Sequence, residues 1–315
     1  MKRVFLLVAA AALSLVVTSC SKYRYEKVAD DPMHSRIYTL DNGLKVYMTV
    51  NEEAPRIQTY IAVRVGSKND PLETTGLAHY FEHLMFKGTE SFGTQNYAAE
   101  KPMLDEIERL FEVYRAQTDP EERRAIYARI DSVSQEASKL AIPNEYDKLM
   151  SAIGADGTNA FTSYDMTVYT EEIPSNQVDN WAKIQSDRFA NAVIRGFHTE
   201  LETVYEEYNM SLTSDGGKMF DSLMVALYPH HPYGMHTVLG TQEDLKNPSI
   251  TNIKNYYKTY YVPNNMAICL SGDFDPDKMI ATIDNYFGSL EPNPALPEWT
   301  FTPEPAMTAP VEKTV

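Results

Sequence analysis

The sequence predicts an α+β fold in which helices pack on one face of a mainly antiparallel sheet. Short alternating runs of apolar and polar residues flank Asp41-Asn42-Gly43, a pattern typical of a β-hairpin, and a run rich in β-branched residues follows over 57–65. Longer segments carry apolar stripes at the 3.6-residue period of amphipathic helices. Hydrophobic residues make up 43% of the 315-residue chain, which is enough for a sizeable core.

The predicted elements alternate between these two kinds along the chain. Strands are expected at 36–40, 44–50, 57–65, 158–170 and 266–270. Helices are expected within 76–89, twice within 99–140, and at 174–192, 199 to beyond 210, 244–260 and 275–287, with an interruption at 215–217.

The two helices between residues 99 and 140 form a predicted antiparallel hairpin. Asp119 is a good N-cap and Pro120 suits the first helical position of the second helix. Aromatic and aliphatic residues at helical spacing line one side of each helix, a pattern more typical of a core than of a ligand site.

The first 20 residues resemble a lipoprotein-type signal peptide. A basic start precedes an apolar stretch over 4–17, which is short for a membrane span, and the stretch ends in Val17-Thr18-Ser19-Cys20. This ending is similar to a bacterial lipobox, in which Cys20 becomes lipid-modified; an ordinary secretory signal with an unmodified cysteine is the alternative. We therefore expect a protein of the bacterial cell envelope, lipid-anchored through Cys20 to a membrane on its periplasmic or surface face.

The charge and cysteine content exclude some functions. The formal net charge is −16, which argues against nucleic acid as a partner. Cys20 and Cys269 are the two cysteines of the chain, so no disulfide framework is expected.

The segment from Gly76 to Thr89 contains the strongest chemical signal. His79 and His83 lie one turn apart on the predicted helix and can aim two imidazoles at one point, with the Glu82 carboxylate beside it. A catalytic zinc takes three protein ligands and a water, and Glu82 is placed to take a proton from that water. Two core histidines and a surface glutamate are the alternative, but His-x-x-Glu-His is the inverted zinc-protease signature.

A third ligand is expected from the acidic segment over 200–209. Its four glutamates could all lie on a solvated helix face. However, Glu200 and Glu207 share one face near Val204, so they are expected to be partly buried. Two buried carboxylates are costly without a cation to neutralise them. By contrast, His230, His231 and His236 have no helical or strand spacing that would favour a second metal site.

These two segments resemble the signatures of the pitrilysin/insulinase family of zinc metallopeptidases, the inverzincins, which include the mitochondrial processing peptidase. The resemblance implies the metallohydrolase fold of those subunits and one Zn²⁺ per catalytic domain. It also implies specific residue roles: His79, His83 and Glu207 as ligands, Glu82 as the base that activates a zinc-bound water, Glu200 as a support of the metal site, and Asn159-Ala160-Phe161-Thr162 as the strand that binds substrate.

The resemblance covers about residues 36–290 and suggests the N-terminal catalytic half of such a peptidase. A tether over 21–35 would precede this domain, and a Pro-rich linker over 291–315 would lead towards a missing partner domain. The helical hairpin at about 99–140 is interpreted as an insertion, because it lengthens the sequence between the first signature and the second beyond what is usual in the family. Family members close two similar domains around a peptide, so we expect a second homologous domain or subunit to complete the cleft.

The favoured hypothesis is a zinc-dependent metalloendopeptidase that hydrolyses peptides or unfolded protein segments. The peptide would add as a strand beside residues 159–162. A catalytically inactive metal-binding scaffold or partner subunit of a peptidase complex is the main alternative, and a lipoprotein that sequesters zinc or peptides is a weaker one.

Overall fold

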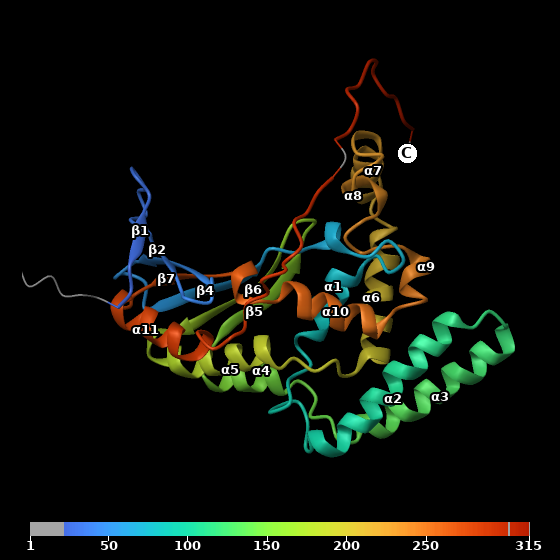
Figure 1. Cartoon of the computed structure of the whole chain (residues 1–315), viewed down its shortest axis with the longest axis horizontal. Helices are drawn as coiled ribbons and strands as arrows, with labels where there is room; N and C mark the ends of the chain where they lie inside the picture. Colours follow the sequence, from blue (N-terminus) through green and yellow to red (C-terminus); the bar gives the residue numbers. More distant parts are fainter. Residues whose placement is uncertain (1–21, 302, 315) are drawn as a thin grey trace, which may run out of the picture.

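Seven strands form one sheet in the computed structural model, which describes residues 22–301 and 303–314 (Figure 1). The order across the sheet is β1-β2-β3-β7-β4-β6-β5, and every neighbouring pair is antiparallel except β3 with β7. The expectation of a mostly antiparallel sheet is therefore confirmed. The strands are β1 (Tyr25–Lys27), β2 (Arg36–Thr39), β3 (Lys45–Val50), β4 (Arg56–Val63), β5 (Asp156–Thr162), β6 (Thr167–Pro174) and β7 (Met266–Gly272).

The sheet has one buried face and one more open face. Along β4, Ile61 is fully buried while its neighbour Tyr60 is 39% exposed. Ile61 pairs with Ile268 of β7 and Tyr169 of β6, which are buried as well. This alternation is expected when helices cover one face of an antiparallel sheet.

The helices lie against the buried face and at one end of the sheet. In Figure 1, α4, α5 and α11 run below the strands, while α1, α6 and α10 gather at the end where β5 and β6 turn. The helices are α1 (Leu77–Leu84), α2 (Tyr97–Ala116), α3 (Pro120–Ser138), α4 (Glu145–Ala152), α5 (Val178–Ala190), α6 (Phe197–Ser211), α7 (Asp215–Leu227), α8 (Pro232–Met235), α9 (Gln242–Leu245), α10 (Ile250–Tyr260) and α11 (Pro276–Phe287).

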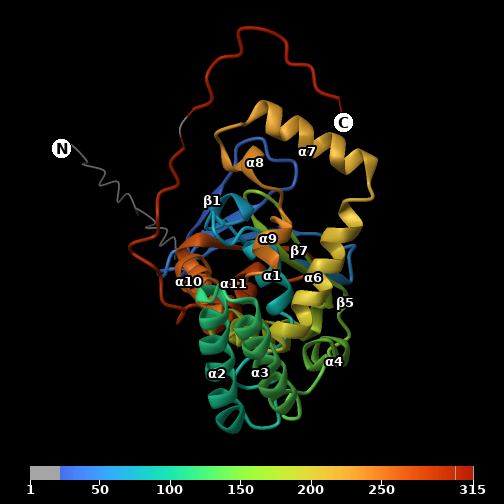
Figure 2. The same cartoon turned by 90° about the vertical axis from the view of Figure 1, so that its right-hand side faces the viewer.

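The predicted helical hairpin is present as α2 and α3, which extend away from the sheet as an arm (Figures 1 and 2). Asp119 caps α3 by accepting hydrogen bonds from the backbone N–H groups of Glu121 and Glu122, at 2.9 and 3.0 Å. Helix α2 begins two residues before the expected range because the side chain of Asn96 caps it, accepting from the Ala99 N–H at 3.1 Å.

The single strand expected over 158–170 is wrong, because the chain reverses at residues 163–166 and forms β5 and β6. The Ser163 hydroxyl accepts hydrogen bonds from the backbone N–H groups of Asp165 and Met166, both at 3.2 Å, and this stabilises the turn. The reversal places β5 at the edge of the sheet.

Three helix boundaries also differ from the prediction. The helix expected from residue 174 begins at Val178, because β6 continues to Pro174. The chain breaks at 212–214 rather than at 215–217, because Ser214 caps α7 and the following glycines lie in the first turn of that helix. The helix expected over 244–260 is divided into α9 and α10 around Pro248, and Ser249 caps α10.

Three short elements were not predicted: α4, α8 and β1. Helix α4 lies between the hairpin and β5, and β1 forms inside the expected tether, where it pairs with β2 at the edge of the sheet. Backbone pairing with an existing edge stabilises such a short strand, and local sequence does not reveal it.

The expected signal peptide over 1–20, with Cys20, lies outside the described residues. Within the described residues, no helix has the length and apolar character needed to cross a membrane. The described part of 291–314 forms neither helix nor strand and runs upwards past α8 (Figure 1).

The two faces of β4 predict different responses to substitution. Ile61→Ala removes fully buried atoms and leaves a cavity, so the free energy of unfolding should fall by about 2–5 kcal/mol. Tyr60→Thr, on the open face, should change it by less than about 1 kcal/mol. Urea denaturation of both variants measures this difference, and equal losses would contradict the assignment of faces.

Candidate metal centre

Helix α1 presents the two histidines of the zinc-protease signature from one side of a mostly buried helix. Leu77, Phe81 and Leu84 are almost fully buried, and Phe81 packs edge-on against Tyr261 with ring centroids 4.8 Å apart. The apolar stripe thus fixes how α1 rotates about its axis. The side chains of His79 and His83 keep 14% and 18% exposure on the other side.

Helix α6 brings Glu207 to the same point. The His79 and His83 Nε2 atoms lie 3.3 Å apart, and a Glu207 carboxylate oxygen lies 3.4 and 3.5 Å from them. Zinc bonded tetrahedrally to nitrogen and oxygen at about 2.0–2.1 Å separates its ligand atoms by about 3.3–3.4 Å. These three side chains therefore fit a zinc ion in both donor type and spacing. Among the described residues, no other trio of His, Cys, Asp or Glu ligand atoms meets as closely.

Glu200 supports this arrangement from the side away from the ligand triangle. One of its oxygens lies 2.8 Å from His83 Nδ1, and the other pairs with the Lys87 ammonium. Burial raises the pKa of Glu200, but the hydrogen bonds with His83 and Lys87 outweigh it and the pKa is lowered overall. An ionised Glu200 orients the His83 ring with Nε2 towards the other ligand atoms.

The two histidines lie in different electrostatic environments. Burial, together with the neighbouring His83, lowers the pKa of His79 to about 4, so His79 is neutral at neutral pH. Burial also lowers the pKa of His83, but the hydrogen bond to Glu200 and the nearby carboxylates more than compensate, and the net shift is upward. Metal binding requires the neutral imidazole, so bound protons compete with a cation at the triangle more strongly at His83 than at His79.

Glu82 lies next to the triangle and is connected to the edge strand. Its carboxylate accepts a hydrogen bond of 2.6 Å from the Thr162 hydroxyl, and the residue is 7% exposed. Burial raises the pKa of Glu82, although the hydrogen bond from Thr162 opposes that shift. A carboxylate with a raised pKa is a stronger base than one in free solution.

A hollow of about 530 Å³ joins the ligand triangle to β5. Its lining contains all nine residues that the sequence analysis proposed for the metal, the base and the substrate, so the fold brings them together: His79, Glu82, His83, Asn159, Ala160, Phe161, Thr162, Glu200 and Glu207. Phe86, Lys87, Val238 and Leu239 also line the hollow and were not predicted. The sequence offers no signal for Val238 and Leu239, since their loop reaches the site only through tertiary packing.

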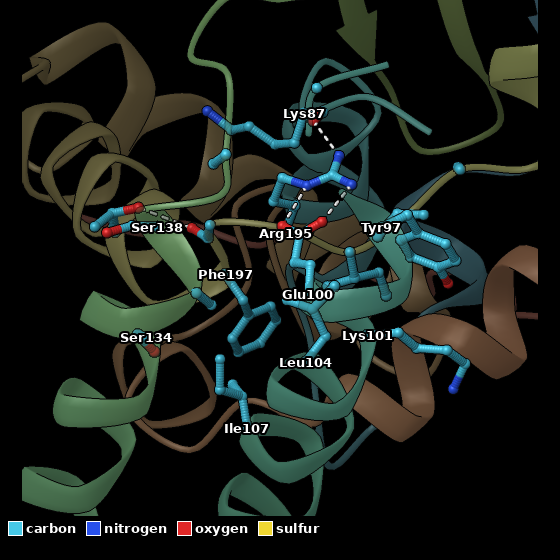
Figure 3. Close-up of a pocket in the computed structure, with 18 of the residues that line it drawn as sticks. Lys87, Tyr97, Glu100, Lys101, Leu104, Ile107, Ser134, Ser138, Arg195 and Phe197 are labelled. Atoms are coloured by element: carbon cyan, nitrogen blue, oxygen red, sulfur yellow. Dashed lines mark hydrogen bonds and ion pairs between the residues drawn. The ribbon is translucent and has the colours of Figure 1, made fainter. Parts of the chain in front are cut away.

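A second cavity, of about 480 Å³, lies between the helical hairpin and the start of α6 (Figure 3). It shares Phe86 and Lys87 with the metal-site hollow but contains none of the three proposed ligands. Within it, Arg195 binds both oxygens of Glu100, at 2.7 and 2.9 Å, and donates to the Lys87 carbonyl at 2.8 Å. Arg195 thus connects Glu100 of α2 with the Lys87 carbonyl in the segment after α1.

His231, His236 and Cys269 have structural surroundings. His231 caps α8 by accepting a hydrogen bond from the Tyr233 N–H at 3.1 Å, and its ring packs against Trp299. His236 is buried, with Nδ1 3.1 Å from the Thr237 carbonyl oxygen. Cys269 lies on β7, and burial raises the pKa of its thiol.

The sequence was compared with families of known proteins. Residues 45–127 match the model described as "Insulinase (Peptidase family M16)", and residues 249–314 match the model described as "Peptidase M16 inactive domain". The first match contains α1 with His79, Glu82 and His83, and the second contains α10, β7 and α11.

Curated relatives and solved structures agree with these matches. The chain is 22% identical over 256 residues to the "Uncharacterized zinc protease YmxG" of Bacillus subtilis, covering 81% of this chain and 50% of the relative. It is 26% identical over 258 residues to the "Probable mitochondrial-processing peptidase subunit beta" of Schizosaccharomyces pombe, covering 81% and 45%. The crystal structure of pitrilysin shares the fold, with a TM-score of 0.63 and 20% identity over 88% of this chain and 26% of pitrilysin.

The chain thus spans about half the length of the curated relatives it matches. Three findings lead to the same family: the chain matches two models of one peptidase family, its relatives include proteins named as zinc proteases, and it shares the fold of pitrilysin. The chain belongs to the insulinase family of zinc peptidases, peptidase family M16.

Proposed function

We propose that this chain is a zinc-dependent metalloendopeptidase that hydrolyses peptides or unfolded protein segments. The observation that carries the proposal is the triangle of His79, His83 and Glu207 ligand atoms, with sides of 3.3–3.5 Å, beside the Glu82 carboxylate. Family membership and the zinc proteases among its relatives support the proposal.

The ligand triangle would hold one zinc, which when bound supplies Lewis acidity to the water and to the scissile carbonyl. Glu82 takes the proton of the attacking water and delivers it to the amine that leaves. The Thr162 hydroxyl, 2.6 Å from Glu82, holds the carboxylate in place during this transfer. Because Glu82 is almost fully buried, little bulk water competes for the proton.

Substrate binding is assigned to the free edge of β5. Residues 159–162 pair with β6 on one side only, and β5 is the last strand of the sheet. A peptide in extended conformation can hydrogen-bond to this edge as an additional strand, so its backbone supplies much of the affinity. Since Thr162 ends β5 and binds Glu82, a peptide on this edge would pass directly beside the base.

A second homologous domain or subunit is proposed to complete the cleft. The hollow at the metal site is open to solvent, and this chain covers only about half of its curated relatives. One specific observation favours an alternative: residues 249–314 match a domain described as inactive, as expected for a metal-binding partner subunit without turnover of its own. The intact Glu82 and ligand triangle favour the catalytic role.

Replacing Glu82 tests the chemical step. Glu82→Gln keeps the size of the side chain but cannot accept the proton, so peptide turnover should fall by about 10²- to 10⁴-fold while zinc content stays at one ion per chain. Peptide cleavage and metal analysis, on the chain alone and with a candidate partner domain, measure both quantities. Undiminished hydrolysis would remove Glu82 from this role; zinc without turnover in the wild type, even with a partner, would favour the inactive subunit.

Replacing Glu207 tests the third ligand. Glu207→Gln removes the charge of the carboxylate, and zinc affinity should fall by more than about 100-fold, since even residues that only support a metal ligand contribute 10- to 100-fold. The matched control is Glu206→Gln, because Glu206 is adjacent, exposed and outside the triangle. Competition with a chelator measures the two affinities, and equal affinities would exclude Glu207 as a ligand.

Attachment to a membrane is proposed separately, on the sequence ending in Cys20. If Cys20 carries acyl chains, the full chain expressed in bacteria should fractionate with membranes, and Cys20→Ala should release it into the soluble fraction. Fractionation with Cys269→Ala as control measures this. A soluble wild type would contradict the lipid anchor without affecting the peptidase proposal.

A further inference from the structure

Helix α1 is too short to fix its own position. It has eight residues, and isolated helices of fewer than about 12–15 residues are marginal in water. Its two histidines must nevertheless hold their Nε2 atoms 3.3 Å apart and meet a carboxylate from another helix. The apolar stripe fixes the rotation of the helix about its axis, and groups outside the helix that bind its two ends can fix its position along that axis.

The N-terminal end of α1 is bound by Asp70. The N-cap residue is Gly76, which has φ +85° and no side chain that could cap the helix. Asp70, six residues earlier and 6% exposed, supplies the missing acceptor: its two oxygens accept hydrogen bonds from the N–H groups of Gly76 at 2.8 Å and Ala78 at 2.9 Å. An acidic side chain at this end matches the positive end of the helix dipole.

The C-terminal end of α1 is bound by Arg188 of α5. The Arg188 Nε–H donates at 3.0 Å to the carbonyl oxygen of Met85, the C-cap residue of α1. A cation at this end matches the negative end of the helix dipole. The sequence gives no indication of this contact, because Arg188 lies 103 residues after Met85.

Arg188 has no solvent exposure, and the groups around it hold its guanidinium in place. Its Cζ lies 4.3–4.6 Å from the ring centroids of Phe86, Tyr146 and Tyr169, and its Nη1 donates to the Tyr146 hydroxyl at 2.7 Å. The carboxylate of Glu171, also fully buried, lies 3.7 Å from Nη1. Aromatic faces and a nearby anion together compensate for the desolvation of the guanidinium.

We propose that Asp70 and Arg188 are positioning residues that clamp α1 at both ends and thereby hold His79 and His83 in metal-binding geometry. Buried ionic groups are a poor route to stability, because well-packed apolar residues of similar size are often as good. Their value lies in directed hydrogen bonds to particular backbone atoms, here the two ends of one helix. This proposal rests on the proposed function insofar as the ligand triangle binds zinc, but not on hydrolysis.

The alternative role for both residues is general stabilisation of the fold. The two roles differ in one measurable quantity, the affinity for metal at matched loss of stability. A suitable control is Val46→Ala, because Val46 is fully buried in β3 and three strands separate β3 from β5. This substitution should lower the melting temperature through lost packing and leave α1 in place.

The experiment measures zinc affinity of the full chain by competition with a chelator, the cobalt absorption spectrum, and the melting temperature of the metal-free protein. Asp70→Asn and Arg188→Met should each weaken zinc binding by about 10- to 100-fold and alter the cobalt spectrum. Arg188→Lys, which keeps the cation, should recover part of the affinity. Val46→Ala should bind zinc as the wild type does.

Zinc affinities of Asp70→Asn and Arg188→Met equal to that of Val46→Ala would overturn the clamp and leave both residues a structural role. If Arg188→Met does not fold, Arg188→Lys and Asp70→Asn decide the question by the same comparison with Val46→Ala. A wild type that binds zinc but cleaves no peptide, even with a partner domain added, would refute the peptidase proposal and leave this comparison intact. A wild type that binds no zinc would overturn both proposals.

Discussion

The central physical constraint in this protein is that three candidate ligand atoms from two helices converge within 3.5 Å. The helices are far apart in sequence, so the contact between α1 and α6 decides whether the site exists. The Tyr80 hydroxyl of α1 donates to the Phe197 carbonyl of α6, and the two rings pack with centroids 4.8 Å apart. The Lys87–Glu200 ion pair adds a second link beside the metal site. Packing and charge thus fix the same interface.

The sheet supplies a surface for this pair of helices and a free edge beside the candidate metal site. Strand β5 is the last strand of the sheet, and its outer edge lies unpaired next to the hollow. The turn at 163–166 reverses the chain and creates that edge, and Thr162 then joins it to Glu82. A strand that ran on through these residues would have no such edge beside the metal site.

The charged groups fall into two classes with different consequences. Surface pairs such as Lys101–Asp105 are screened by water and contribute little to the free energy of unfolding. The buried Arg188 donates to the Met85 carbonyl at the end of α1, and the buried Arg195, which is paired with Glu100, donates to the Lys87 carbonyl just after it. The interior charges therefore surround the short helix that carries the histidines, where directed hydrogen bonds set position more sharply than apolar contacts can.

The sequence by itself determined the features that depend only on residues close together along the chain. The i, i+4 spacing of His79 and His83, the Asp119 cap and the turn at 41–43 follow from local geometry and are found as expected. Only the tertiary structure decided the edge position of β5, the pairing of Lys87 with Glu200 and the contacts of Asp70 and Arg188 with α1. A side chain and a backbone atom 103 residues apart, such as Arg188 and Met85, meet only because the core packs in one way, and no local pattern records that packing.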